Sequence, residues 1–243
     1  MISLRTIWDA ALNLIYPPVC QICQQERAGI HEGYVGGECW SQVRFVTAPF
    51  CNRCGLPYEG SIGQTFVCEN CADLDFHFRS ARSAVRVNPL ILQVVHQYKY
   101  NRALWFESFL ADLLIRQAVP VLQEEKWDVI VPVPLHPARQ REREFNQAER
   151  LARHLGRAVE ISVNSNLIRR VKPTETQTQL NRAGRADNVR GAFAPRTRKK
   201  LNGEKIIIVD DVMTTGATTN ACAGVLQKAG AGEICVWTVA RGV

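Results

Sequence analysis

Four cysteines in the first third of the chain have the spacing of zinc ligands. Two C-x-x-C pairs are separated by thirteen residues, and they contain Cys51, Cys54, Cys68 and Cys71. Both sulfur atoms of such a pair can face one ion, and two pairs complete the tetrahedral thiolate shell that Zn²⁺ prefers. We therefore predict a zinc ribbon with a structural zinc ion. Because four protein ligands leave no coordination position open for catalysis, we expect a scaffold or a docking surface here.

Disulfide bonds are the alternative use of these cysteines. They persist in oxidising compartments, which a protein reaches with a secretory signal. In this chain Asp9 interrupts the apolar run at the N-terminus, whereas the core of a signal peptide carries no charge. We therefore expect a cytoplasmic protein with zinc-bound cysteines, whose first residues form an amphipathic helix.

A second group of cysteines consists of Cys20, Cys23 and Cys39. A C-x-x-C pair that ended at Cys39 would need a cysteine at position 36, which is Gly36. His31 is an alternative fourth ligand, although an isolated histidine in a glycine-rich loop is more often exposed. The residues predict a second, incomplete zinc site and leave its fourth ligand open.

Acidic and hydroxyl side chains follow an apolar run near the C-terminus. Residues 206–209 predict a strand that is buried on both faces, and Asp210 and Asp211 come directly after it. The next residues form a loop that opens a helix, and they include Thr214, Thr215, Gly216, Ala217 and Thr218. Backbone N–H groups at a helix start suit a phosphate, and carboxylates accept hydrogen bonds from ribose hydroxyls. The pattern predicts a sugar-phosphate site at the carboxyl edge of an open α/β sheet.

Positive charge is concentrated in the middle of the chain. Residues 135–200 contain 16 basic and 6 acidic side chains, whereas the whole chain has a formal net charge of +7. A focused positive field attracts phosphates, so we predict an anionic ligand or a nucleic acid, with a solvated arginine-rich surface as the alternative. Arg139, Arg141 and Arg143 precede a predicted helix and are the candidates for contacting pyrophosphate or another anion. With only two aromatic residues, the segment lacks the signature of a platform that stacks single-stranded bases.

Further elements must position these groups. Residues 127–134 predict a core strand that ends at prolines. The helix after the arginines has one apolar face, which contains Phe145, Ala148, Leu151, Ala152 and Leu155. Residues 172–190 have almost no apolar periodicity, and a loop of that length in a compact domain is usually functional or disordered. They include Arg182 and Arg185, which together with Arg139, Arg141 and Arg143 are the candidates for contacting DNA.

Length and composition divide the chain into two parts. With 243 residues it suits one main domain and a smaller one, and seven of its nine cysteines fall in the first 71 residues. We predict a module with the N-terminal helix and the zinc ribbon over residues 1–79. Residues 80–243 are predicted to form an α/β domain, a parallel sheet flanked by helices. No apolar run reaches the ~18–20 residues of a membrane span.

The run IIIVDDVMTTGAT closely resembles the phosphoribosyl-pyrophosphate (PRPP) binding motif of type I phosphoribosyltransferases. It follows a cysteine-rich start and the motifs V-P-V-P-L-H-P, F-N-Q-A and Q-x-x-L-x-R-x-x-R-x-x-N, in that order. This combination resembles the ComF/GntX family across nearly the whole chain. It is most similar to the GntX-type members, which are linked to the use of external DNA as a nutrient.

The resemblance implies a type I phosphoribosyltransferase-like fold for the second domain. It implies that Asp210 and Asp211 contact the ribose 2′- and 3′-hydroxyls and that residues 214–218 hold the 5′-phosphate. Mg²⁺ would accompany PRPP if the protein is catalytic, and no catalytic residue is assigned. Residues 172–190 stand where that fold has a mobile lid over the active site.

Two positions depart from the family pattern. Glu144 stands where the family usually has glycine, which places a carboxylate near the predicted pyrophosphate loop and argues against efficient PRPP turnover. Gly36 stands where a zinc-binding cysteine is usual, which indicates that one zinc site has degenerated.

Three functions are compatible with the sequence. The resemblance implies a protein that supports competence-type uptake or utilisation of external DNA. Such a protein would bind PRPP or a related sugar phosphate, and its partner would be single-stranded DNA or a DNA-uptake protein. The second function is an active PRPP-dependent transferase on an unknown acceptor, although we identify no hood that would recognise a base. The third is a regulator that senses PRPP or a nucleotide without turnover.

Overall fold

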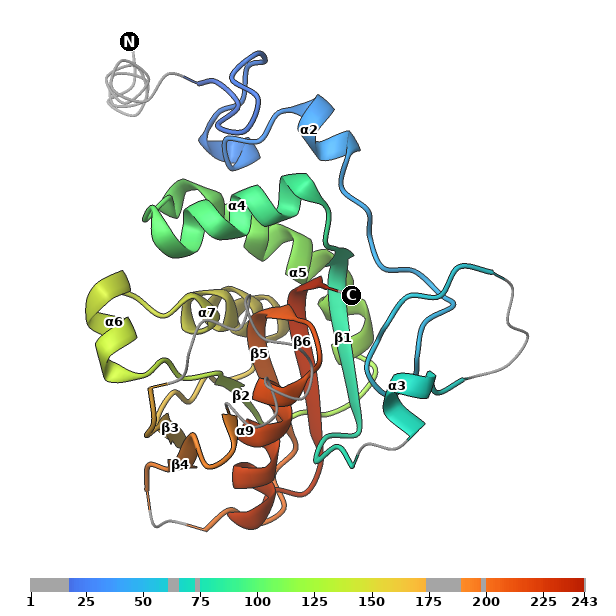
Figure 1. Cartoon of the computed structure of the whole chain (residues 1–243), viewed down its shortest axis with the longest axis vertical. Coiled ribbons are helices and arrows are strands. Elements are labelled where there is room, and N and C mark those ends of the chain that lie inside the picture. The colour runs from blue at the N-terminus through green and yellow to red at the C-terminus, as the bar shows by residue number, and fades with distance from the viewer. Residues whose placement is uncertain (1–17, 61–65, 73–74, 174–188, 198–199, 243) are drawn as a thin grey trace. The chain divides into compact units, whose positions relative to one another are not determined.

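The computed structural model describes residues 18–60, 66–72, 75–173, 189–197 and 200–242 (Figure 1). The chain forms two compact units, each assembled from two stretches of sequence. One unit comprises the described parts of Met1–Val43 and Asn88–Phe109, and the other comprises those of Arg44–Val87 and Leu110–Val243. The predicted N-terminal helix lies outside the described residues. The division of the chain at residue 79 stays a prediction.

The first unit consists of short helices joined by loops. Its elements are η1 (Ile30–Glu32), α2 (Gly37–Ser41), α4 (Pro89–Tyr100) and η2 (Leu104–Phe106). The longest of them, α4, begins after Asn88, whose side chain accepts a hydrogen bond from the backbone N–H of Ile91 at 2.8 Å. Pro89 occupies the first helical position, where its missing N–H costs nothing. Capping and proline together fix where this helix starts.

The second unit is built on a parallel sheet of four strands in the order β1-β6-β5-β2. The strands are β1 (Ser80–Arg86), β2 (Val129–Pro132), β5 (Ile206–Met213) and β6 (Ile234–Arg241). The helices outside the first unit are α3 (Glu69–Ala72), α6 (Pro137–Arg143), α7 (Gln147–Val159) and α9 (Ala217–Lys228), and α5 (Glu107–Leu122) belongs to both units. A separate antiparallel pair consists of β3 (Ile168–Arg170) and β4 (Phe193–Pro195). The predicted parallel sheet with flanking helices is confirmed.

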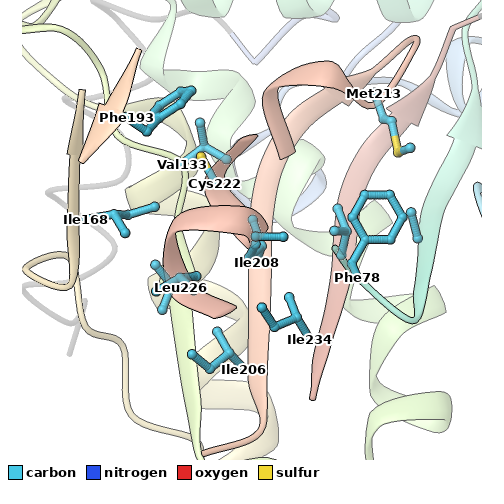
Figure 2. Packing of buried hydrophobic residues seen from close by; sticks show 14 of the residues in the cluster. Phe78, Val133, Ile168, Phe193, Ile206, Ile208, Met213, Cys222, Leu226 and Ile234 are labelled. Carbon is cyan, nitrogen blue, oxygen red and sulfur yellow. The ribbon is translucent and has the colours of Figure 1, made fainter. Parts of the chain in front are cut away.

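The core of this unit lies on both faces of β5. Residues 206–209 are fully buried, as their unbroken β-branched run predicts. Ile206 and Ile208 point towards Cys222 and Leu226 of α9, as Figure 2 shows. The residues between them face the other way because successive side chains alternate along a strand. A strand covered on both faces places its carboxyl end at a rigid edge of the sheet.

The other predicted elements of the second unit also form. The core strand before the prolines is β2, and the amphipathic helix after the arginines is α7. Ala148, Leu151, Ala152 and Leu155 are buried on one face of α7. Phe145 was wrongly predicted on this face, because the helix begins only at Gln147, after the cap residue Asn146. Among the residues that the structure describes, no helix has the length and apolar character to cross a membrane.

Candidate ligand site and metal centres

The acidic pair lies within β5 itself, because this strand continues to Met213 and so extends past the predicted apolar run. Asp210 is half-buried, and Asp211 is buried with 7% of its surface exposed. The backbone N–H of Asp211 donates to the Oδ1 atom of Asp210 at 2.9 Å. Since all neighbours in the sheet are parallel, both carboxylates lie at its carboxyl edge. Open α/β sheets bind their ligands at this edge.

The loop after β5 needs a glycine at position 216. Gly216 has a φ of +80° and stands directly before the first residue of α9. A Cβ atom at this position would lie 2.7 Å from the Cε atom of Met213 and 3.4 Å from the Cε1 atom of Phe76. The loop therefore turns tightly over packed side chains, in a backbone conformation that residues other than glycine rarely adopt.

Threonine hydroxyls surround the start of α9. The Oγ1 atom of Thr215 accepts a hydrogen bond from the N–H of Ala217 at 3.3 Å, and Thr219 donates to the carbonyl of Gly216 at 3.0 Å. Thr214 and Thr218 are half-buried on the same turn. A helix start that places backbone N–H groups beside hydroxyls suits a phosphate.

Arginines of two other elements are candidates for binding an anion, and Arg170 of β3 is half-buried. Burial lowers the pKa of Arg170 on β3, whereas the charge of Asp210 raises it and the charges of Arg139 and Arg143 lower it. The predicted anion-binding residues Arg139 and Arg143 both lie on α6. Arg170 was missed because nothing in its short strand separates it from the many other arginines of the basic segment.

The predicted arginine loop contains the short helix α6. It begins at His136, whose Nδ1 atom accepts from the N–H of Ala138 at 3.3 Å, and it ends at Glu144 in the left-handed conformation with a φ of +68°. Glycine adopts that conformation at less cost than glutamate, which is the physical reason why the family pattern has glycine at position 144. Arg139 pairs with Glu142 at 3.2 Å.

Asn146 ties α7 to the end of β2. Its side-chain amide donates to the carbonyl of Val133 at 3.0 Å, and its Oδ1 atom accepts from the N–H of Ala148 at 3.1 Å. The side chain is buried, with 7% of the residue's surface exposed. The F-N-Q-A and V-P-V-P motifs are therefore joined through this one residue.

A cavity of about 1070 Å³ lies between α6, β3 and the loop after β2. Its lining includes Arg141, Arg153, Arg169, Arg170 and Arg196. Glu149 is the single carboxylate in the lining. Asp210 and Asp211 are not among the described residues that line this cavity. Its charge suits a ligand with several phosphates.

The four cysteines of the ribbon converge as predicted. Their sulfur atoms all lie within 4.8 Å of one another, and Cys68 is 3.7 Å from Cys54 and 3.6 Å from Cys71. Zinc–sulfur bonds near 2.3 Å would place tetrahedral sulfur atoms about 3.8 Å apart. Burial raises the pKa of the Cys51 thiol, but backbone N–H groups, chiefly those of Cys54 and Cys68, lower it to about 7. Burial and the charge of Cys54 raise the pKa of Cys68 to about 11, and burial and the neighbouring thiols also raise the pKa of Cys71, which a bound cation would offset. The residues therefore fit a zinc ion held by thiolates.

Arg241 connects this ribbon to the loop after β5. Its buried guanidinium donates to the carbonyl of Cys54 at 3.3 Å and lies 3.6 Å from the sulfur atom of that residue. The same group donates to the carbonyls of Met213, at 3.1 Å, and of Thr214 and Gly242. One side chain thus joins a predicted zinc ligand to the first residues of the candidate phosphate loop.

The segment that leaves the ribbon packs beneath the same loop. Phe76 and Phe78 stack with their ring centroids 4.7 Å apart, and Phe78 lies near Met213 in Figure 2. The N–H of His77 donates to the Oδ1 atom of Asn220 on α9 at 2.7 Å. The amide of Asn220 donates in turn to the carbonyl of Asp75 at 3.2 Å. The segment therefore supports both the loop and the first turns of α9.

The second cysteine group gathers around an unexpected carboxylate. Cys20, Cys23 and Cys39 lie with Glu26 so that all four possible ligand atoms are within 4.8 Å of one another. The side chain of His31 lies outside what the structure describes. Glu26 was not predicted, because its position in the sequence matches no C-x-x-C pattern.

The fold and these sites define an α/β protein with a parallel sheet, flanking helices and a cysteine-rich ribbon. Residues 11–72 match the double zinc ribbon domain. The chain is 31% identical over 224 residues to competence protein F of Haemophilus influenzae, covering 90% of this chain and 96% of the relative. It is 31% identical over 231 residues to DNA utilization protein YhgH of Salmonella typhimurium, covering 94% and 99%. The chain belongs to the ComF/GntX family of competence and DNA-utilization proteins.

A solved structure of purine phosphoribosyltransferase from Pyrococcus horikoshii is also similar to this chain. The two share 24% sequence identity with a TM-score of 0.33, over 55% of this chain and 83% of that one.

The first prediction concerns the ribbon's metal. Full-length protein with Cys51→Ser should contain about one zinc ion fewer per chain than the wild type, because structural sites need all four ligands. Metal analysis of protein purified without added zinc measures this. Cys222→Ala is the control, since it removes a buried thiol outside both cysteine groups and should keep the metal content. A folded wild type without zinc would refute the assignment.

The second prediction concerns Arg241. Arg241→Lys keeps the charge but cannot reach several acceptors with one planar group, so the free energy of unfolding should fall by about 2 kcal/mol or more. Arg86→Lys is the matched control, because Arg86 pairs with Glu59 at the surface and should change stability by less than about 1 kcal/mol. Urea unfolding compares the two variants. If both variants lost equally little free energy of unfolding, the hydrogen bonds of Arg241 would contribute little to stability.

Proposed function

We propose that the protein binds PRPP or a related sugar phosphate at the junction of β5 and α9, and that it acts in the utilisation of external DNA. The observation that carries the proposal is the position of Asp210 and Asp211 at the carboxyl edge of the sheet, beside a threonine-rich helix start. The names of the relatives, competence protein F and DNA utilization protein, support the second part.

Each group of residues would have a separate task. The carboxylates of the acidic pair would accept hydrogen bonds from ribose hydroxyls, which are donors. The hydroxyls and N–H groups of the loop would hold the 5′-phosphate. Arg139, Arg141 and Arg143 would face the pyrophosphate, because their charge complements it, and Arg170 lines the same cavity as Arg141.

Magnesium would accompany PRPP if the protein transfers the ribosyl group. Half-buried Asp210 offers the oxygen ligand that this ion prefers, and the ion would neutralise charge on the pyrophosphate. Purified protein with PRPP and Mg²⁺, followed for thermal shift and for pyrophosphate release, separates binding from turnover. A shift without release would favour a binding protein or a sensor over a transferase.

The third prediction tests the sugar-phosphate site. Asp211→Asn and Thr215→Val should each lower PRPP affinity about ten- to a hundredfold, because a lost hydrogen bond to a charged group costs about 1.5–3 kcal/mol. Calorimetric titration measures the affinity. The same variants should fail to restore growth on DNA in a strain that lacks this protein.

Asp128→Asn is the matched control for that experiment. Asp128 is exposed just before β2, at the opposite end of the sheet, and accepts from the backbone N–H of Lys205. This variant should bind PRPP and support growth like the wild type. Unchanged PRPP affinity in both site variants would contradict the proposed site, even if growth were lost.

The fourth prediction concerns direct contact with single-stranded DNA. Several phosphates along the basic cavity should give a slope of log affinity against log salt of about −2 or steeper, since each contact contributes about −0.7. Arg141→Ala should make the slope shallower by one such contact. Arg116→Ala, on α5 and paired with Asp112, should leave it unchanged.

Fluorescence anisotropy with a labelled oligonucleotide measures that slope. A flat salt response, or no binding in low salt, would exclude direct contact and assign the role in DNA use to a protein partner. Arg182 and Arg185, the other predicted contacts, lie outside the described residues.

A further inference from the structure

The carboxylate of Glu26 lies beside three cysteines in the first unit, and the four possible ligand atoms are all within 4.8 Å of one another. The sulfur atoms of Cys20 and Cys39 are 3.6 Å apart, and the sulfur atom of Cys23 lies 3.8 Å from the Oε1 atom of Glu26. Zinc bonds of 2.3 Å to sulfur and about 2.1 Å to oxygen give separations of about 3.8 and 3.6 Å in a tetrahedron. Each observed distance, 3.6 Å between sulfur atoms and 3.8 Å between sulfur and oxygen, lies within about 0.2 Å of the expected value.

Glu26 occupies the space that a side chain at position 36 would fill. A Cβ atom built on Gly36 would lie 2.0 Å from the Cδ atom of Glu26 and 2.4 Å from its Oε1 atom. A cysteine at position 36 would form a C-x-x-C pair with Cys39. The carboxylate therefore lies where the fourth thiolate of a regular ribbon site would be.

The backbone delivers and holds this carboxylate. The N–H of Cys20 donates to the carbonyl of Glu26 at 2.8 Å. The chain therefore turns back and places Glu26 beside the C-x-x-C pair of Cys20 and Cys23. The N–H of Glu38 donates to Oε2 at 3.1 Å, and that of Cys39 donates to Oε1 at 3.3 Å. Carboxylates that bind metals in proteins are typically hydrogen-bonded in this way, which fixes their orientation.

Charge also favours this ligand set. Three thiolates and one carboxylate carry the same total charge as four thiolates, and Zn²⁺ accepts carboxylate oxygen as well as sulfur. Cys20 and Cys39 are buried, so deprotonated sulfur atoms here need a cation. Without Glu26, three cysteines would leave one coordination position of the metal open.

We propose that Cys20, Cys23, Cys39 and Glu26 bind a second structural zinc ion, in which Glu26 replaces the cysteine that is absent at position 36. The site is then a complete one with a different fourth ligand. This inference is independent of the sugar-phosphate site, because it concerns the metal content of the other unit.

The fifth prediction is that Glu26→Gln loses the second zinc. Glutamine can still accept the two backbone hydrogen bonds, but its neutral amide is a poor zinc ligand, so zinc affinity at this site should fall at least about tenfold. Full-length wild type should contain two zinc ions per chain, and the variant should contain one after dialysis against a mild chelator. Glu38→Gln is the matched control and should keep two, because the side chain of Glu38 is not among the four ligands.

A ligand exchange distinguishes a metal ligand from a residue that only caps α2. Glu26→Ala combined with Gly36→Cys frees the space and supplies a fourth thiolate, so it should restore two zinc ions. Gly36→Cys alone should not improve binding, because its Cβ atom would collide with Glu26. In cadmium-substituted protein, the ¹¹³Cd resonance of this site should move downfield when sulfur replaces oxygen.

Three results would overturn the proposal. A wild type with one zinc ion per chain would show that the second site does not hold metal. Two zinc ions of unchanged affinity in Glu26→Gln would show that the carboxylate only stabilises the start of α2. A wild-type ¹¹³Cd spectrum that does not change in the exchanged variant would mean that oxygen was never a ligand.

Discussion

The second unit depends on the hydrogen bonds that the buried guanidinium of Arg241 donates. A buried cation is stable only when its donors are satisfied and its charge is balanced. Cys54 supplies a carbonyl and a sulfur atom, and the loop after β5 supplies the carbonyls of Met213 and Thr214. A zinc ion held by four thiolates would leave a net negative charge beside the guanidinium. The ribbon and the loop therefore stabilise each other through one side chain.

This arrangement gives the ribbon a structural task. The loop carries no disulfide, and its tight turn at Gly216 rests on Met213 and Phe76. The ribbon is joined to the loop at Cys54, through Arg241, and the segment that leaves the ribbon contacts α9. A binding loop needs such support, because ligand geometry must be held to a fraction of an ångström. We propose that the zinc ribbon orders the phosphate loop from beneath while its open side stays available for the ligand.

The sequence predicts those parts that local patterns determine. The unbroken apolar run at 206–209 predicts β5, and the 3.6-residue spacing from Ala148 to Leu155 predicts α7. The ribbon cysteines follow a fixed spacing, so their convergence is predictable as well. In each case a short stretch of sequence contains all the information that is needed.

Other features depend on contacts between distant residues and so escaped prediction. Glu26 meets Cys39 only because the chain folds back, and Arg241 meets Cys54 across 187 positions of sequence. The helix α6 was missed because its arginine-rich run buries no residue and therefore has no apolar period. The predicted lid over residues 172–190 lies mostly outside the described residues and stays a prediction.

Hydrogen–deuterium exchange of the full chain, before and after zinc is removed with a chelator, tests the central connection most directly. If the ribbon supports the loop through Arg241, amides of residues 213–220 should lose protection together with those of residues 50–56, while the buried strand at 206–209 keeps its protection. Faster exchange confined to the ribbon, with residues 213–220 unchanged, would contradict this account.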